Sequence, residues 1–164
     1  MQERFRVVFV SRRNSLRSIL AAACLAHLDG ARFVAISCGA PGHVAPAVHP
    51  AAIDALGTAH IPVPAKEPCS WATILRGPPS RINFVILLDE SIETLLPPWP
   101  GQPDFATWPF PDVAAESDPE TAARAAIQVL HSLRRRLELL IALTMRGTDR
   151  AAIRSDVREL GHMI

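Results

Sequence analysis

The chain has 164 residues, 49% hydrophobic and 20% charged, a composition that fits one compact domain covering residues 1–164. It carries 17 basic and 16 acidic residues, and the net charge of +1 gives no general attraction for nucleic acid. The apolar run near the N-terminus has four residues and no stretch reaches the length of a membrane span, so we expect a soluble, unprocessed, cytoplasmic protein without a membrane partner.

Four short apolar runs are typical of strands that are covered on both faces, as in a parallel sheet. They lie at residues 6–10, 32–37, 83–88 and, more weakly, 107–110. The stretch 96–111 contains six prolines, which interrupt regular structure, so we expect a long surface loop there.

Helical patterns alternate with these runs. Residues 15–28 carry apolar side chains at helical spacing before Asp29 and Gly30, and a short helix is expected to open at His49 and Pro50. Asp118 is the predicted N-cap of the longest helix, whose apolar stripe should lie on the sheet while Arg134, Arg135 and Arg136 mostly face solvent.

A last helix is predicted at residues 148–162, capped by Thr148 and carrying an apolar stripe for docking or for a partner. Strands that alternate with helices predict a doubly wound α/β sheet, in which ligands bind at the carboxyl ends of the strands. The loop after the first strand is therefore the place to look for a site.

That loop reads SRRNSLRS and passes from a strand into a helix N-terminus, where unpaired N–H groups and the helix dipole attract anions. Arg17 can grip two oxygens of a tetrahedral anion, Asn14 tolerates the left-handed backbone of a tight loop, and Ser18 offers a hydroxyl. The predicted anion-binding residues are Ser11, Arg12, Arg13, Asn14, Ser15, Leu16, Arg17 and Ser18.

This loop resembles that of the low-molecular-weight protein tyrosine phosphatases and the arsenate reductases built on the same fold. In that family the first strand leads into Cys, five residues, Arg and Ser, with Asn three residues after the Cys. The chain has Asn14, Arg17 and Ser18 in the corresponding positions, and Ser11 in place of the cysteine nucleophile.

Three further segments resemble the family. Residues 37–39, Ser-Cys-Gly, are similar to a Ser-Ala-Gly segment, which implies that Ser37 supports the loop asparagine, and residues 48–53 are similar to the Pro-x-Ala-Ile helix start. WPGQP at 99–103 and WPFPD at 108–112 resemble segments of the proteobacterial branch usually called arsenate reductases. The resemblance covers nearly the whole chain and implies a flavodoxin-like α/β/α sandwich with a four-stranded parallel sheet.

The same resemblance gives Asp112 the place of the general acid, with Ser11 and Arg17 as the other catalytic positions. The chain departs from the family where it matters for chemistry. A cradle can lower the pKa of a cysteine thiol from about 8.5, whereas a serine hydroxyl needs a neighbouring base, and the loop contains no histidine. Val113 follows Asp112 where the family has proline, and Arg13 replaces a glycine.

These departures favour a protein that binds phosphate, sulfate or a phosphorylated ligand and is catalytically impaired. One alternative is an active phosphatase in which Ser11 is the nucleophile, or a cysteine-to-serine trapping variant, with Asp112 as acid. Another is a non-catalytic regulatory subunit that works through a homodimer or a protein partner. The segment around Leu88 lacks the resolving cysteines of the thioredoxin-coupled reductases, which argues against arsenate reduction.

The remaining residues suggest no cofactor and no metal site. The six histidines have no ligand spacing, and the spacing of Cys24, Cys38 and Cys69 matches neither a zinc site nor a disulfide framework. We expect Cys24 to be a buried apolar residue within a helix. Trp108 is expected to pack in the fold or to wall the pocket beside Asp112.

Overall fold

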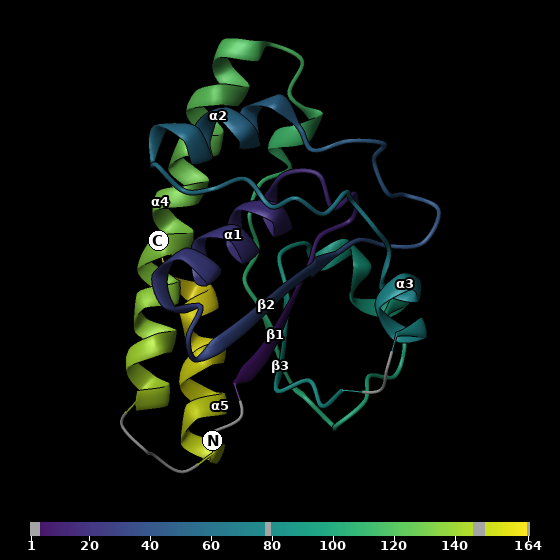
Figure 1. Ribbon diagram of the computed structural model, residues 1–164, viewed down its shortest axis with the longest axis vertical. Coiled ribbons are helices and arrows are strands. Elements are labelled where there is room, and N and C mark those ends of the chain that lie inside the picture. Colours follow the sequence, from purple (N-terminus) through teal and green to yellow (C-terminus); the bar gives the residue numbers. More distant parts are fainter. Residues whose placement is uncertain (1–3, 78–79, 146–149, 164) are drawn as a thin grey trace.

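The computed structural model describes residues 4–77, 80–145 and 150–163. Four parallel strands form one sheet in the order β2-β1-β3-β4. They are β1 (Phe5–Val10), β2 (Phe33–Cys38), β3 (Phe84–Leu87) and β4 (Asp104–Thr107). The predicted α/β fold with a four-stranded parallel sheet is confirmed, and the first three strands lie where the apolar runs predicted them (Figure 1).

The fourth strand lies earlier than predicted. The sequence favoured residues 107–110, but β4 spans Asp104–Thr107 within the proline-rich stretch expected to be a loop. The residues between Pro103 and Pro109 contain no proline, so they keep the N–H groups that a strand needs. The segment forms a strand because it pairs with β3, and its own short sequence could not predict that partner.

Five α-helices and three short 3₁₀ helices complete the described elements. The α-helices are α1 (Arg17–Asp29), α2 (Pro50–Thr58), α3 (Trp71–Arg76), α4 (Pro119–Met145) and α5 (Arg150–Glu159). The 3₁₀ helices are η1 (Glu90–Leu95), η2 (Val113–Ala115) and η3 (Leu160–His162). Sequence patterns did not predict α3 or η1, which are too short to show a period.

The predicted helix starts are confirmed where a side chain caps them. His49 Nδ1 accepts a hydrogen bond from the Ala51 N–H at 3.0 Å, and Pro50 occupies the first position of α2. Asp118 Oδ2 accepts the Thr121 N–H at 3.2 Å, as an N-cap does. The predicted cap Thr148 lies outside the described residues.

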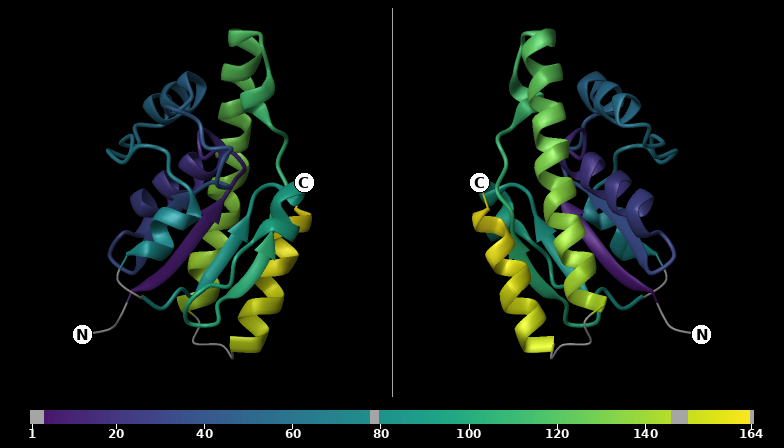
Figure 2. Two further views of the ribbon diagram at one scale, coloured as in Figure 1. Left: turned by 90° about the vertical axis from the view of Figure 1, so that its right-hand side faces the viewer. Right: turned by 90° about the vertical axis from the view of Figure 1, so that its left-hand side faces the viewer.

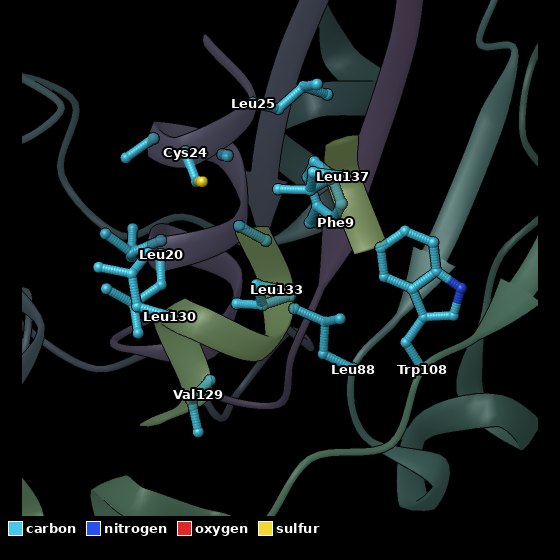
Figure 3. Packing of buried hydrophobic residues seen from close by; sticks show 14 of the residues in the cluster. Phe9, Leu20, Cys24, Leu25, Leu88, Trp108, Val129, Leu130, Leu133 and Leu137 are labelled. Atoms are coloured by element: carbon cyan, nitrogen blue, oxygen red, sulfur yellow. The ribbon is translucent and has the colours of Figure 1, made fainter. Parts of the chain in front are cut away.

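Two hydrophobic clusters lie on opposite faces of the sheet. Alternate residues of β1 separate them, since Val7 and Phe9 belong to the larger cluster and Val8 and Val10 to the smaller one. Helices α1, α2, α4 and α5 contribute to the larger cluster, whereas the smaller one is covered by α3, η1 and the loop around Trp99 (Figure 2). Figure 3 shows side chains of α1 and α4 together with Phe9 of β1 and Leu88, the residue after β3.

The C-terminal helix packs against the last strand. Val157 and Leu160 are buried in the larger cluster, and the Trp108 indole N–H donates to the Val157 carbonyl at 2.9 Å. The predicted apolar stripe of this helix therefore docks within the chain. Trp108 is fully buried in the same cluster, so it packs in the fold.

The arginine run of α4 does not face solvent as a whole, which corrects the prediction. Arg136 is 3% exposed and donates hydrogen bonds to the Leu160 and Met163 carbonyls at 2.8 and 2.6 Å. Its guanidinium also lies 4.5 Å from the centre of the Phe110 ring. The helical period turns one of three adjacent arginines inward, and the C-terminal turn supplies carbonyl acceptors there.

The helices in the described part of the chain are either too short or too polar to span a bilayer.

Cys24 is completely buried in α1, as predicted. Burial raises the pKa of its thiol to about 11, and the charges of Arg134 and Glu138 shift this pKa in opposite directions.

Candidate anion-binding site

The loop of residues 11–16 lies at the carboxyl end of β1, a central strand, and leads directly into α1. Ser11, Asn14, Ser15 and Ser18 are all buried, although each is polar. Buried polar side chains at this edge of an α/β sheet are expected to be hydrogen-bonded and are typical of a ligand site.

The backbone of the loop is held from outside by the segment that follows β2. Carbonyl oxygens of Arg12 and Arg13 accept the N–H groups of Ala40 and Ala45, each at 2.9 Å, and the Ser15 carbonyl accepts the His49 N–H at 2.8 Å. In a trans peptide the carbonyl and the next N–H point in opposite directions. The N–H groups of Arg13, Asn14 and Leu16 therefore point away from the segment that follows β2 and toward the inside of the loop.

Two residues allow the loop to close so tightly. Asn14 has a φ of 52°, in the left-handed region that asparagine tolerates better than most residues. A Cβ at Gly39 would lie 2.8 Å from the Arg12 carbonyl oxygen and 3.1 Å from the Asn14 backbone nitrogen. The chain after β2 can therefore approach the loop this closely only with glycine at position 39. Among the described residues, no backbone hydrogen bond is donated by residues 12–17. These N–H groups are available to an anion.

The Asn14 side chain ties the loop to two neighbours. Its Oδ1 accepts the Cys69 N–H at 2.9 Å, and its Nδ2 donates to Ser18 Oγ at 2.8 Å. Ser37 was expected to support this asparagine, but the described contacts of the amide are to Cys69 and Ser18. Ser37 lies within β2, opposite Phe9, and its carbonyl accepts from the Cys69 thiol at 3.8 Å. Cys69 takes the supporting role because its segment pairs alongside Gly39 and so reaches the loop.

Ser11 lies directly after β1, at the position that the loop motif predicts for a nucleophile. Its hydroxyl lies 2.7 Å from the Ser18 hydroxyl, and the side chain is almost completely buried. Within the described part of the chain, Ser11 Oγ has no hydrogen bond to a histidine or a carboxylate, the groups that activate a serine. Ser11 thus shapes the loop without an adjacent base.

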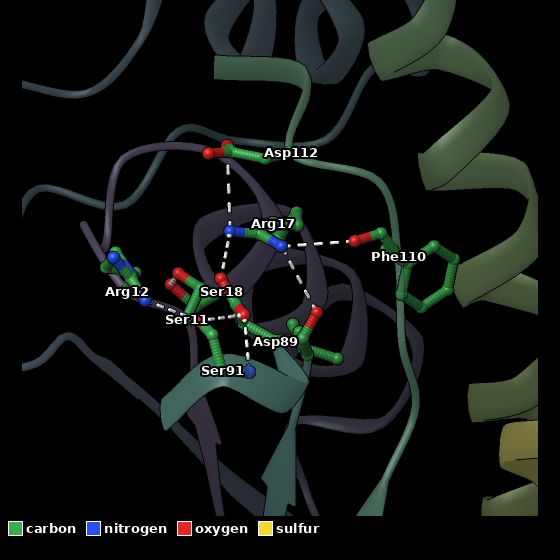
Figure 4. Close-up of polar contacts among 9 residues, drawn as sticks. Ser11, Arg12, Arg17, Ser18, Asp89, Ser91, Phe110 and Asp112 are labelled. Carbon is green, nitrogen blue, oxygen red and sulfur yellow. Dashed lines mark hydrogen bonds and ion pairs between the residues drawn. The ribbon is translucent and has the colours of Figure 1, made fainter. Parts of the chain in front are cut away.

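Arg17 is the most highly connected side chain of the site. It is 5% exposed, and Nη1 donates to the carbonyls of Leu88 and Phe110 at 3.3 and 3.1 Å. Nη2 donates to Asp89 at 2.9 Å and lies 3.6 Å from an oxygen of Asp112 (Figure 4). The guanidinium is therefore positioned at the carboxyl ends of β1 and β3, between two carboxylates.

Asp89 is a site residue that the motif comparison missed. It follows β3 and accepts the N–H and the hydroxyl of Ser91 as well as Arg17. Burial favours the neutral carboxyl, but the bonds from Ser91 and the charge of Arg17 outweigh it and lower the pKa of Asp89. An acidic residue directly after the strand adjacent to β1 was the signal that could have found it.

Asp112, the predicted acid, lies beside Arg17. Its side chain is 35% exposed and it immediately precedes η2, whose Val113 is buried.

Arg12 is connected to Asp89 through Ser91, because its Nη2 donates to Ser91 Oγ at 2.6 Å. Arg13 is exposed at the loop. The structure thus gathers Ser11, Asn14, Arg17, Ser18 and Asp112, residues that are up to 101 positions apart in the sequence.

Comparison with solved structures finds two groups of proteins with this fold. An arsenate reductase described in its phosphate binding state has 27% identity and a TM-score of 0.66, covering 84% of this chain and 97% of its own. A low-molecular-weight protein tyrosine phosphatase from T. tengcongensis has 18% identity and a TM-score of 0.65, covering 84% of this chain and 98% of its own.

A thioredoxin-dependent arsenate reductase from Corynebacterium glutamicum has 19% identity and a TM-score of 0.59, covering 84% of this chain and 64% of its own. No protein-family model matches the chain, and no curated protein does. The resemblance read from the loop motifs agrees with these structural neighbours. The chain therefore has the fold that these arsenate reductases and low-molecular-weight protein tyrosine phosphatases share, and its structural neighbours match the superfamily that the loop motifs indicated.

Proposed function

We propose that the protein binds phosphate or a similar oxyanion in the 11–18 loop and is impaired as a phosphatase because Ser11 stands in place of the nucleophilic cysteine. The observation that carries this proposal is the closed loop itself. Loop carbonyls accept hydrogen bonds from the segment that follows β2, and Asn14 has a left-handed backbone conformation. The N–H groups of residues 12–17 donate no described backbone hydrogen bond, so they are available to an anion. A similar solved structure is described as an arsenate reductase in its phosphate binding state, which supports the same ligand class.

Impairment follows from the chemistry of position 11. A thiol can be held as a thiolate by N–H donors and a helix N-terminus, but a serine hydroxyl does not ionise at neutral pH and must lose its proton to a base. The nearest described partner of Ser11 Oγ is another hydroxyl, that of Ser18. The loop can therefore orient an anion without attacking it efficiently.

Arg17 has two carboxylate contacts, and we expect an anion to replace one of them. Its contact with Asp112 is the longer of its two carboxylate contacts and the more exposed to water. An incoming anion displaces Asp112 from Arg17 more readily than Asp89, because less desolvated charge has to be separated. Asp89 then continues to position the guanidinium while two anion oxygens take the place of Asp112.

Phosphate binding is the first test. Isothermal titration of the protein with inorganic phosphate should give saturable binding, and Arg17→Met should weaken the affinity by about tenfold or more, the loss of roughly 1.4 kcal/mol or more. Arg134→Met is the matched control, since Arg134 pairs with Glu138 on the exposed face of α4 and should leave the affinity unchanged. Absence of phosphate binding by the unaltered protein would reject the proposal and favour the regulatory subunit.

Hydrolysis of an aryl phosphate is the second test. The unaltered protein should be nearly inactive, and Ser11→Cys should raise the rate by orders of magnitude if position 11 is the main defect. Turnover by the unaltered protein at ordinary enzyme rates, abolished by Ser11→Ala and by Asp112→Asn, would instead establish the active serine phosphatase. A cytoplasmic location and a homodimer or protein partner remain expectations.

A further inference from the structure

Two cysteines lie on neighbouring segments that support the anion-binding loop. The end of β2 and the segment before α3 form a short parallel pairing, in which Gly39 is opposite Ser70. The Gly39 N–H donates to the Cys69 carbonyl at 2.8 Å, and the Trp71 N–H donates to the Gly39 carbonyl at 3.0 Å. The residues immediately before this pair are Cys38 and Cys69.

This register brings the two cysteine side chains to the same side. Residues one step before a parallel pair face each other across strands about 4.8 Å apart, with side chains on one face. Disulfide-linked cysteines usually have Cα atoms about 4.4–6.8 Å apart, so the spacing suits a disulfide. Both cysteines contribute to the smaller hydrophobic cluster, and the Cys69 thiol lies 3.8 Å from the carbonyl of Ser37, the residue before Cys38.

The two thiols differ in accessibility. Cys38 is completely buried, whereas Cys69 is partly exposed, and the structure has both as free thiols. Burial, together with the nearby Cys69, raises the pKa of Cys38 although Lys66 acts in the opposite direction. An oxidant from solution thus meets Cys69 first, and Cys38 is the thiol within reach of the product.

We propose that Cys38 and Cys69 are a modification site that closes to an intramolecular disulfide when the protein meets a hydroperoxide. Cys69 attacks the peroxide oxygen to form a sulfenic acid, and one molecule of water or alcohol leaves. The Cys38 sulfur then attacks the Cys69 sulfur, the S–S bond forms, and the sulfenic oxygen leaves as water with the Cys38 proton. Two electrons pass from the two thiols to the peroxide, and a dithiol reductant reverses the reaction.

The pair is connected to the anion-binding loop by backbone hydrogen bonds. The Cys69 N–H holds Asn14 Oδ1 at 2.9 Å, and the Cys38 carbonyl accepts the Ser11 N–H at 3.2 Å. Drawing the two sulfurs together shifts both supports, so the disulfide should weaken phosphate binding. This effect rests on the proposed function, whereas formation of the disulfide does not.

Peptide mapping by mass spectrometry under non-reducing conditions tests the disulfide. After mild treatment with hydrogen peroxide, the folded protein should lose the mass of two hydrogens and yield a linked peptide containing Cys38 and Cys69, and dithiothreitol should restore both thiols. Cys38→Ser and Cys69→Ser should each abolish the linked peptide. Cys24→Ser, at a buried thiol of the opposite cluster, is the matched control and should retain it.

Three results would overturn the disulfide: a sulfinic acid at Cys69 with Cys38 still reduced, a linkage through Cys24, or linkage only between two chains. Phosphate titration of the reduced and oxidised protein tests the coupling, and we expect about fivefold weaker binding after oxidation. Unchanged affinity in a protein that carries the disulfide would reject the coupling. A disulfide in a protein that binds no phosphate in either form would confirm the modification site and reject the proposed function.

Discussion

Arg17 lies between two carboxylates that differ in exposure, and in the proposed function this difference makes Asp112 the group that competes with an anion. The Asp112 side chain is 35% exposed and 3.6 Å from Arg17, whereas Asp89 is 15% exposed and 2.9 Å away. The same carboxylate that would act as an acid thus partly neutralises the guanidinium before an anion arrives.

We predict that Asp112→Asn tightens phosphate binding. The amide keeps the size of the side chain but removes its charge, so Arg17 is left with one opposing carboxylate and the affinity should rise by about two- to tenfold. Titration calorimetry at low ionic strength measures the change. Glu93→Gln removes an equal charge from the exposed side of η1 and should have a smaller effect; equal effects from both variants would show a general charge effect instead.

Asp89 should contribute to stability in a pH-dependent way. Its pKa is lowered in the folded protein, so its contribution is complete above the unfolded value of about 3.9 and is lost as the pH falls through the folded value. Asp89→Asn should reduce the free energy of unfolding at pH 7 by about 1.5–3 kcal/mol, because Arg17 then donates to a neutral amide oxygen instead of a carboxylate.

Urea unfolding at several pH values tests this prediction. The difference between the unaltered protein and Asp89→Asn should be constant near neutral pH and should shrink below about pH 4, where Asp89 is protonated first in the unfolded chain and only at lower pH in the folded protein. A difference that stays the same at low pH would mean that the loss comes from packing and not from the charge.

At the level of elements, the C-terminal turn closes the fold against the end of β4. A Cβ at Gly161 would overlap the carbonyl of Thr107, a backbone group that cannot move aside easily. The same turn supplies the Leu160 carbonyl to Arg136, whose guanidinium lies over Phe110, and the Phe110 carbonyl binds Arg17. Gly161, which is far from the 11–18 loop in sequence, is therefore connected to that loop through a series of contacts.

Gly161→Ala should destabilise the protein by about 1–3 kcal/mol through this overlap. Gly57→Ala is the matched control, since no atom lies within 4 Å of a Cβ at this position in α2, and alanine should raise the stability by about 0.5–1 kcal/mol. Thermal unfolding followed by tryptophan fluorescence distinguishes the two, because Trp108 bonds to Val157 just before the turn. Equal stability of the two variants would show that the turn gives way without cost.

For the molecule as a whole, stability depends mainly on the larger cluster between the sheet and helices α1 and α4. Leu137 is completely buried there, in the same cluster as Phe9 and Trp108 (Figure 3), whereas Leu139 on the same helix is 43% exposed. The two leucines have the same helix propensity and differ in burial alone.

Leu137→Ala should therefore reduce the free energy of unfolding by about 2–5 kcal/mol, through lost burial and the cavity left behind. Leu139→Ala should change it by about 0.5 kcal/mol or less, as exposed substitutions usually do. Chemical denaturation of both variants provides the comparison. A large loss from Leu139→Ala would indicate that this face of α4 is covered in solution, by a second copy or by a partner.

Features that depend on neighbours along the chain could be predicted from the sequence. Apolar runs marked β1, β2 and β3, and caps at His49 and Asp118 marked two helices, because burial of a strand and capping of a helix are local requirements. The 11–18 motif likewise marked the candidate anion site. The position of β4 was harder to predict, since four residues between prolines show no period of their own.

Contacts between distant segments came from the way the elements pack. The support of Asn14 by Cys69, the pairing of Arg17 with Asp89, the bonding of Arg136 to Leu160 and the pairing of Gly39 with Ser70 each join residues of different segments. Such contacts depend on strand order and register, which periodicity does not record. The local pattern therefore specified a candidate anion-binding loop with a serine at its start, and the packing around it specified which groups hold the loop and which carboxylates pair with its arginine.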